Sequence, residues 1–431
     1  MVLKTTTGAV VGEQSDGRTA FRGIRYGNLA NGRRFDPVAP AAHDSVQDLR
    51  NFPAMFPQLP SRLDTLLGTA CRKHPQEEDA FLLNVWMPSG AANLPVLFFI
   101  HGGGFVSGGG VIPWYSGGRL AREGDMVVVT TNYRLGPLAH LVTGPDGDDA
   151  NRAVDDLLQA LIWVRENIGL FGGDPGNLTV AGQSAGAFYA QILAVLPESR
   201  GLIRRLLLMS TPGIPASSRS RTESLSGEVI ENLQGADPST VPVDSLLRSH
   251  QQVMKKHVRF GSVGPTCLLP TVDARVPDWL DNPGSVAKAL DVADLLVTFT
   301  HDETGAYFFN SRERDITTEQ VRQLGFGRTT TTYETPYAEL VARTTASLFG
   351  DYAKGLVAAA REHGIRAELR EFDVPSPLDG LGSCHGFDMP FLFGNRAAWV
   401  GAHLLDGIDD DLFEAEGGKL RAAVADLVHL P

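Results

Sequence analysis

The sequence predicts an α/β fold, built on a mostly parallel central sheet with helices on both faces. Three observations support this prediction. Short apolar runs of strand length alternate with segments of helical periodicity, a glycine-rich loop follows one of these runs, and a G-x-S-x-G motif follows another. Strands of a parallel sheet are covered on both faces, so they are expected to read as continuous apolar runs.

Six short segments are the candidates for buried strands. They span residues 96–100, 126–131, 178–181, 206–209 and 295–300, and also 367–372, where charged residues alternate with apolar ones. Between the second and third runs, apolar residues recur at the spacing of one helix face, at Leu157, Leu161, Val164 and Ile168. A further apolar helix is expected at 187–196, after the third run. In such sheets the ligand site lies at the carboxyl ends of the strands.

Two charged segments with helical patterns lie outside this alternation, at about 217–258 and 317–364. We interpret them as helical insertions that cap the site. The sequence contains no internal repeat, low-complexity segment or recognisable linker. We therefore expect a single domain over 1–431.

The G-x-S-x-G motif is Gly182-Gln183-Ser184-Ala185-Gly186. A serine on a sharp turn between a strand and a helix exposes its hydroxyl, and flanking glycines let the two elements pack closely. The N–H group of Ala185 then lies at a helix N-terminus, where developing negative charge is stabilised. The motif therefore predicts a nucleophilic serine at Ser184.

A second motif, His101-Gly102-Gly103-Gly104-Phe105, follows the apolar run at 96–100. Successive glycines leave backbone N–H groups open to a ligand oxygen, as an oxyanion hole requires. The alternatives are a flexible glycine turn and a phosphate-binding loop. Neither G-x-G-x-x-G nor G-x-x-x-x-G-K-[ST] fits these residues. We expect Gly103 and Gly104 to supply N–H donors to an oxyanion.

Composition excludes other classes of protein. The chain of 431 residues is 43% hydrophobic and carries a formal net charge of −12, whereas nucleic-acid binding usually needs a basic face. The first residues include no apolar signal segment, and no apolar run approaches the roughly eighteen residues of a membrane span. The three cysteines are scattered without C-x-x-C spacing. These features predict a cytoplasmic protein that binds neither nucleic acid nor membrane.

Further motifs follow one another along the chain. They are FRGIRY at 21–26, EDAFLLNVW at 78–86, NYRLG at 132–136, FGGDP at 171–175, DETG at 302–305 and HGFDMPF at 385–391. With the two glycine motifs, their order and spacing resemble the type-B carboxylesterases, the family that also contains the cholinesterases. This resemblance implies the α/β-hydrolase fold and hydrolysis of carboxylic esters, without a metal or an organic cofactor.

A nucleophilic serine needs a base, and the base needs a carboxylate to fix its tautomer. In α/β-hydrolases these residues follow in the order serine, acid, histidine. His385 lies in a loop of small residues soon after a candidate strand and matches the catalytic histidine of the family. Glu303 follows the run at 295–300 and matches the family's acid, with Asp302 as the local alternative. A solvated charged turn is the alternative to a catalytic role at this position.

Departures from the family pattern concern the substrate. Gln183 stands where cholinesterases have a glutamate, and no Trp, Tyr or Phe lies between Phe56 and Ala80 to bind a choline cation. Trp114 and Tyr115 follow the glycine loop and are candidates for lining an acyl or alcohol pocket, or for ordinary packing. The family disulfide is absent at the matching positions, Phe56 and Ala80. These departures predict a small-molecule ester that is not a choline ester.

The expected protein is a serine hydrolase that cleaves carboxylic esters through an acyl-enzyme. Hydrolysis of a lactone, thioester or carbamate, or acyl transfer, is the alternative within the same chemistry. A catalytically inactive binding protein on this scaffold is the alternative of another class, but such relatives typically lose the serine or the histidine. The sequence leaves both a monomer and a homo-oligomer open.

Overall fold

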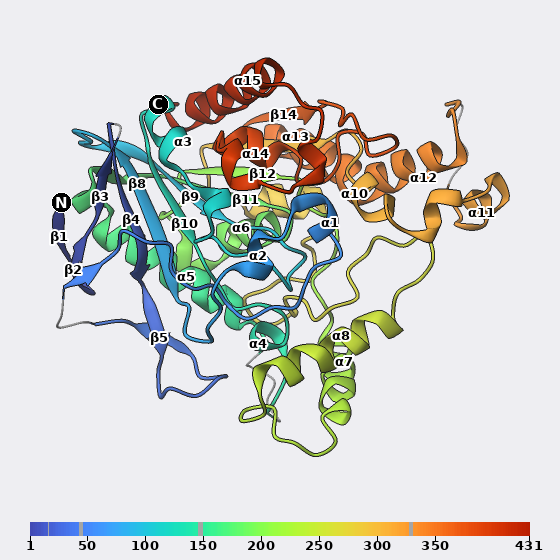
Figure 1. Ribbon diagram of the computed structural model, residues 1–431, viewed down its shortest axis with the longest axis horizontal. Helices are drawn as coiled ribbons and strands as arrows, with labels where there is room; N and C mark the ends of the chain where they lie inside the picture. The colour runs from blue at the N-terminus through green and yellow to red at the C-terminus, as the bar shows by residue number, and fades with distance from the viewer. Residues whose placement is uncertain (16, 43–45, 145–149, 327–330) are drawn as a thin grey trace.

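A nine-stranded sheet runs through the centre of the computed structural model, which describes residues 1–15, 17–42, 46–144, 150–326 and 331–431 (Figure 1). Its strands lie in the order β14-β13-β12-β11-β9-β10-β8-β4-β3. In chain order they are β3 (Glu13–Ser15), β4 (Arg18–Arg25), β8 (Leu82–Pro88), β9 (Leu94–Ile100), β10 (Val127–Thr131), β11 (Gly173–Gln183), β12 (Arg205–Met209), β13 (Asp294–Thr300) and β14 (Arg366–Phe372). Each of the six predicted segments lies in a strand from β9 to β14, except that 126–131 begins one residue before β10, which confirms the predicted α/β class. The expected burial is wrong for 367–372, because β14 is an edge strand whose residues are mostly exposed or half-buried.

The part of the sheet from β14 to β10 is parallel, whereas β8, β4 and β3 continue it in antiparallel order. The register aligns Gly182 of β11 with Ile100 of β9, and Gln183 with Met209 of β12. The loops after these strands therefore emerge together at one edge of the sheet. This edge carries both glycine motifs.

Alternate residues of the central strands face two separate apolar cores. Val96 and Phe98 of β9 point into one core and Leu97 and Phe99 into the other, and all four side chains are fully buried. The first core is shared with α5 (Arg152–Asn167), α6 (Ala185–Val195), α9 (Pro283–Ala289) and α13 (Asp351–Glu362). The second is shared with α3 (Gly118–Glu123), α14 (Asp388–Phe393) and α15 (Asp410–Val428). Helices thus cover both faces, as the parallel sheet requires.

The first of the two charged segments contains α7 (Arg219–Asn232) and α8 (Val243–Lys256), which project below the sheet in Figure 1. They bury their own small core, which includes Leu225, Val229 and Leu246, against α4 (Gly136–His140).

The second charged segment divides into two parts. Helices α11 (Thr318–Gln323) and α12 (Pro336–Thr345) form an outlying cluster with α10 (Gly305–Phe308). Helix α13 instead packs on β14 and α9, because Leu356, Val357 and Ala360 give it an apolar face toward the sheet. Of the described α-helices in this second segment, α11 and α12 therefore stand apart from the sheet and α13 does not. Residues 327–330 of the segment lie outside the described ranges.

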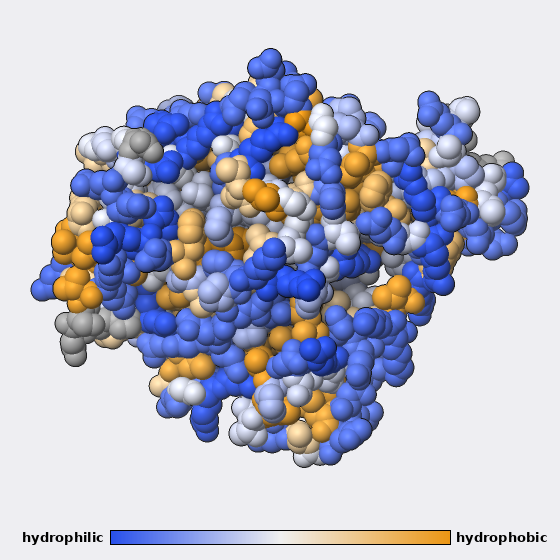
Figure 2. Space-filling model, viewed as in Figure 1, coloured by the Kyte–Doolittle hydropathy of each residue, from blue (hydrophilic) through white to orange (hydrophobic). Residues whose placement is uncertain are grey.

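The N-terminal region adds two small sheets, β1 (Val2–Thr5) with β2 (Gly8–Val11) and β7 (Gln47–Asp48), and β5 (Gly27–Leu29) with β6 (Val38–Pro40). The face shown in Figure 2 is largely hydrophilic, with apolar residues in scattered groups. Across the described ranges, no helix combines the length and the apolar character that crossing a bilayer requires.

Candidate active site

Ser184 occupies the turn between β11 and α6, with backbone angles of φ 57° and ψ −123°. Its N–H donates to the carbonyl of Met209 at 2.8 Å, which fixes the turn to β12. A Cβ atom on Gly182 would lie 2.2 Å from the carbonyl oxygen of Gly186, and one on Gly186 would lie 2.1 Å from that of Ile100. Both glycines of the motif are therefore required by close backbone approach as well as by the bend itself.

His385 reaches Ser184 from the loop between β14 and α14. Its Nε2 lies 2.7 Å from Ser184 Oγ, and its Nδ1 forms a hydrogen bond with Glu303 Oε2. The other oxygen of Glu303 accepts the N–H of Thr300 at 2.9 Å, and the N–H of His385 donates to the Glu303 carbonyl at 3.0 Å. The side chains of Ser184, Glu303 and His385 are all buried, so these hydrogen bonds are protected from competing water.

Asp302 and its neighbour Glu303 have different hydrogen-bond partners. Asp302 Oδ2 accepts the N–H of Ser383 at 3.0 Å, and the N–H of Asp302 donates to the Ser383 carbonyl at 2.9 Å. Partial burial raises the pKa of Asp302. This residue holds the loop that carries His385, whereas Glu303 contacts the imidazole itself.

The glycine loop after β9 has an unusual backbone, with φ 129° at Gly103 and φ 60° at Gly104. The Gly103 carbonyl accepts the N–H of Ser107 at 3.0 Å and its Oγ at 2.9 Å. Within the described part of the chain, the N–H groups of Gly103, Gly104 and Ala185 have no acceptor in the protein. They are free to donate to a ligand oxygen near Ser184.

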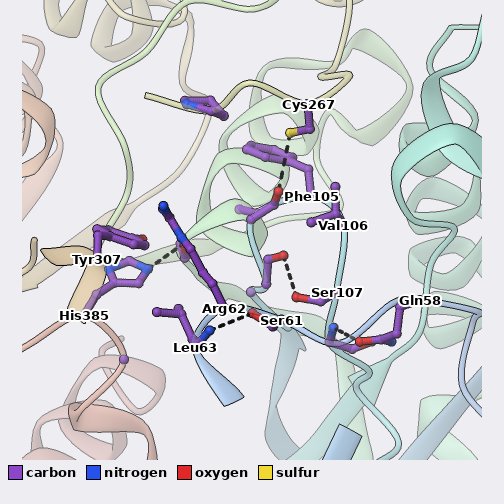
Figure 3. Close-up of a pocket in the computed structure, with 18 of the residues that line it drawn as sticks. Gln58, Ser61, Arg62, Leu63, Phe105, Val106, Ser107, Cys267, Tyr307 and His385 are labelled. Carbon is purple, nitrogen blue, oxygen red and sulfur yellow. Dashed lines mark hydrogen bonds between the residues drawn. The ribbon is translucent and has the colours of Figure 1, made fainter. Parts of the chain in front are cut away.

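His101 supports this loop from beneath. Its ring stacks on Tyr133 with centroids 4.4 Å apart, and its Nδ1 contacts the Gly102 carbonyl at 2.7 Å. Burial lowers the pKa of His101 to about 4, so the imidazole is neutral at pH 7. Gln58 secures the far end of the loop through two hydrogen bonds to the backbone of Gly108, each of 2.7 Å (Figure 3).

A cavity of about 470 Å³ opens over Ser184 and His385. The three residues named from the sequence as pocket candidates all line it. Trp114 stacks on Trp399 at 4.4 Å between ring centroids, Tyr115 packs against Phe393, and Gln183 Nε2 lies 3.3 Å from His385 Nε2. Trp114 and Tyr115 are buried in packing contacts as well, so they form the rigid wall of the cavity.

Several residues at the site were missed by sequence reasoning. Tyr307 and Phe349 flank the His385 ring, with centroids 5.4 and 5.2 Å away, and Arg62 lies over the Tyr307 ring. Tyr307 comes four residues after Glu303, and this short spacing was the only feature of the sequence that could have placed it at the site. Arg62 and Phe349 come from distant segments that carry no motif.

Asp388, three residues after His385, is also buried at the site. Among the described residues, neither of its carboxylate oxygens has a hydrogen-bond partner. Burial and the nearby charge of Glu303 raise the pKa of Asp388 to about 7. Among the same residues, no group of three or more His, Cys, Asp or Glu side chains is arranged to hold a metal ion.

The fold and the serine at the strand-to-helix turn define an α/β-hydrolase. The chain belongs to the carboxylesterase family, whose model matches residues 1–363. It is 32% identical to phenmedipham hydrolase of Pseudarthrobacter oxydans, over 95% of this chain and 86% of the relative. It is 29% identical to para-nitrobenzyl esterase of Bacillus subtilis, over 91% and 83%.

Solved structures agree with this membership. A thermophilic para-nitrobenzyl esterase superposes with a TM-score of 0.81 at 26% identity, over 99% of this chain and 90% of the other. A carboxylesterase of Geobacillus stearothermophilus gives a TM-score of 0.81 at 27% identity, with the same coverage. The resemblance identified from the sequence is thus confirmed, and the chain is a carboxylic ester hydrolase.

Proposed function

We propose that the chain hydrolyses carboxylic esters of small molecules through an acyl-enzyme formed on Ser184. His385 removes the proton of Ser184 as the hydroxyl attacks the ester carbonyl, and then delivers this proton to the leaving alcohol. Glu303 holds the imidazole in the tautomer with hydrogen on Nδ1 and stabilises its charged form. Water then attacks the acyl-enzyme with His385 as the base.

One observation carries this proposal: His385 contacts Ser184 Oγ at 2.7 Å through one ring nitrogen and Glu303 through the other. A histidine held between a hydroxyl and a carboxylate is the arrangement that activates a serine. Gln183 approaches the same Nε2 at 3.3 Å, so its amide is placed to steady the ring before substrate binds.

The free N–H groups of Gly103, Gly104 and Ala185 are the proposed oxyanion hole. Ala185 begins α6, so its N–H also belongs to the positive end of a helix dipole. Donors fixed in place before the reaction stabilise the negative charge that develops on the carbonyl oxygen, and each one is commonly worth about 10²–10³ in kcat.

The same tetrahedral chemistry would serve a lactone, thioester or carbamate. The complete set of serine, base, acid and free N–H donors argues against an inactive binding protein. The three cysteines are free thiols, which supports a reducing, cytoplasmic location. The ligand we propose is a small-molecule ester, with no nucleic acid or membrane as partner.

The acyl-enzyme is tested by partitioning. Two esters with the same acyl group and different alcohols are hydrolysed in the presence of methanol, and the ratio of methyl ester to free acid is measured. A common acyl-enzyme predicts the same ratio from both substrates, because the alcohol has left before methanol attacks. Ratios that differ between the two substrates would contradict it.

The nucleophile is tested in the same assay. Ser184→Ala should lower kcat by roughly 10⁵ or more, because serine and histidine act as a unit. Ser262→Ala, at another part of the cavity wall, is the matched control and should keep its activity. Near-normal turnover by Ser184→Ala with unchanged thermal stability would overturn the assignment.

A further inference from the structure

The cavity differs in charge from the rest of the molecule. The chain carries a formal net charge of −12, yet among the described residues four cationic side chains line the cavity beside a single carboxylate. The cations are Arg62, Arg72, Lys255 and Arg259, and the carboxylate is Asp64. Within the described ranges, none of these four cations forms an ion pair with a carboxylate. A cavity with excess positive charge attracts anions.

Arg62, an exposed side chain, is linked to His385 through the ring of Tyr307. Its guanidinium carbon is 4.9 Å from the centroid of the Tyr307 ring, and that ring is 5.4 Å from the ring of His385. Figure 3 shows the Arg62 side chain extending across the cavity toward Tyr307 and His385. The guanidinium lies over the aromatic face, and within the described ranges its N–H groups donate to no other residue, so they are available to a ligand.

The backbone that carries Arg62 is held in place on both sides. The N–H of Leu63 donates to Ser61 Oγ at 3.2 Å, and Gln58 is tied to the glycine loop through Gly108. Arg62 also lies in the stretch between Phe56 and Ala80 that contains no Trp, Tyr or Phe. This wall of the cavity therefore presents a guanidinium, which binds anions, instead of an aromatic ring that could bind a cation.

We propose that the substrate is an ester whose alcohol part carries a carboxylate, and that Arg62 binds this carboxylate and determines specificity. The assignment rests on the proposed function, in which His385 protonates the leaving alcohol. The alcohol part must therefore lie on the His385 side of the ester bond, where Tyr307 and Arg62 lie. A guanidinium pairs with a carboxylate through two parallel hydrogen bonds, which gives direction as well as affinity.

The test compares two butanoate esters, one of 4-hydroxybenzoate and one of 4-hydroxybenzamide. They have the same acyl group and a similar shape, and differ by one negative charge on the alcohol part. The measured quantity is the ratio of kcat/KM for the anionic ester to kcat/KM for the neutral one. We expect a ratio of about ten or more for the natural chain, and a lower ratio as salt is added.

Arg62→Gln should lower this ratio by about tenfold to a hundredfold, the usual range for a hydrogen-bonded charge pair. Arg62→Lys should give an intermediate ratio, because it keeps the charge and loses the fork. Arg322→Gln on α11, an exposed arginine outside the cavity, is the matched control and should leave the ratio unchanged. A ratio near one in the natural chain, or a ratio that Arg62→Gln does not change, would overturn the proposal.

Binding to Ser184→Ala separates this proposal from the proposed function. This variant should bind 4-hydroxybenzoate more tightly than 4-hydroxybenzamide by calorimetry, and adding Arg62→Gln should remove the difference. If the neutral ester is turned over through Ser184 but the charged ligand has no advantage, the proposed function stands and the role of Arg62 falls. If the anion binds through Arg62 but Ser184→Ala retains turnover, the catalytic assignment falls and the anion site stands.

Discussion

The carboxylate of Asp302 accepts the backbone N–H of Ser383 at 3.0 Å, two residues before His385. The carboxylate of Glu303, the next residue, contacts the His385 ring. Adjacent acids thus serve one histidine in different ways: Asp302 fixes the loop that carries it, and Glu303 fixes its ring. This difference favours Glu303 over Asp302, the two candidates that the sequence left open.

Removing each carboxylate should distinguish the two roles. Glu303→Gln should lower kcat by about 10³–10⁴, because the amide cannot hold the imidazole in the required tautomer or stabilise its charge. Asp302→Asn should cost about tenfold or less, since an amide oxygen can still accept the Ser383 N–H. The measurement is kcat on a neutral aryl ester for both variants. The reverse ranking would assign the acid to Asp302.

The glycine loop gives a second paired comparison. A Cβ atom on Gly103 would lie 1.8 Å from the Ser107 carbonyl oxygen, whereas one on Gly104 would meet nothing within 4 Å. Gly103→Ala must displace the loop, so we expect kcat to fall by about 10²–10³, as on losing an oxyanion donor. Gly104→Ala meets only the cost of a left-handed backbone, about 1–2 kcal/mol. Equal losses of kcat in the two variants would contradict this account of the loop.

Buried Asp388 should make stability depend on pH. Its pKa is about 7 in the folded chain and roughly 3.9 when unfolded, so the folded state binds its proton more tightly. This contribution to stability is present below about pH 4 and is lost as pH rises through about 7. Asp388→Asn lacks the titration. Its stability relative to the natural chain should therefore rise by about 2–3 kcal/mol between pH 5 and pH 8.

Urea unfolding of both proteins at the two pH values measures this effect. The comparison cancels the titrating groups that do not interact with Asp388, because the two chains share them. A stability difference that is the same at pH 5 and pH 8 would show that Asp388 is ionised in the folded chain at both.

The sequence predicted the parallel part of the sheet because the segments 96–100, 126–131, 178–181, 206–209 and 295–300, which lie at β9 to β13, are short and mostly apolar. The antiparallel strands were missed for a physical reason. Asn84 interrupts the apolar run of β8, and its Oδ1 accepts the N–H of Gly23 at 2.8 Å, where the register of β4 shifts. A polar residue that satisfies a bulge in a neighbouring strand cannot be recognised from local periodicity.

The candidate site shows the same division. Ser184 and the glycine loop carry their conformation in local motifs, because close backbone approach at Gly103, Gly182 and Gly186 leaves no room for a side chain. The contact between Arg62 and Tyr307 joins segments far apart in the chain, so neither residue carries a signal of its own. The sequence did not distinguish α13 from α12 within the second charged segment. A helix that covers the sheet and an outlying helix have the same apolar periodicity.

Covalent labelling by a fluorophosphonate ester, followed by peptide mass spectrometry, tests directly whether Ser184 is the nucleophile. The reagent reacts with a serine hydroxyl only where a base activates it and donors receive the developing oxyanion. We expect one adduct per chain, located on Ser184, with activity lost in proportion to labelling and no adduct in Ser184→Ala. Loss of activity with the adduct on any other residue, or full labelling of Ser184 with activity retained, would contradict the assignment of Ser184 as the nucleophile.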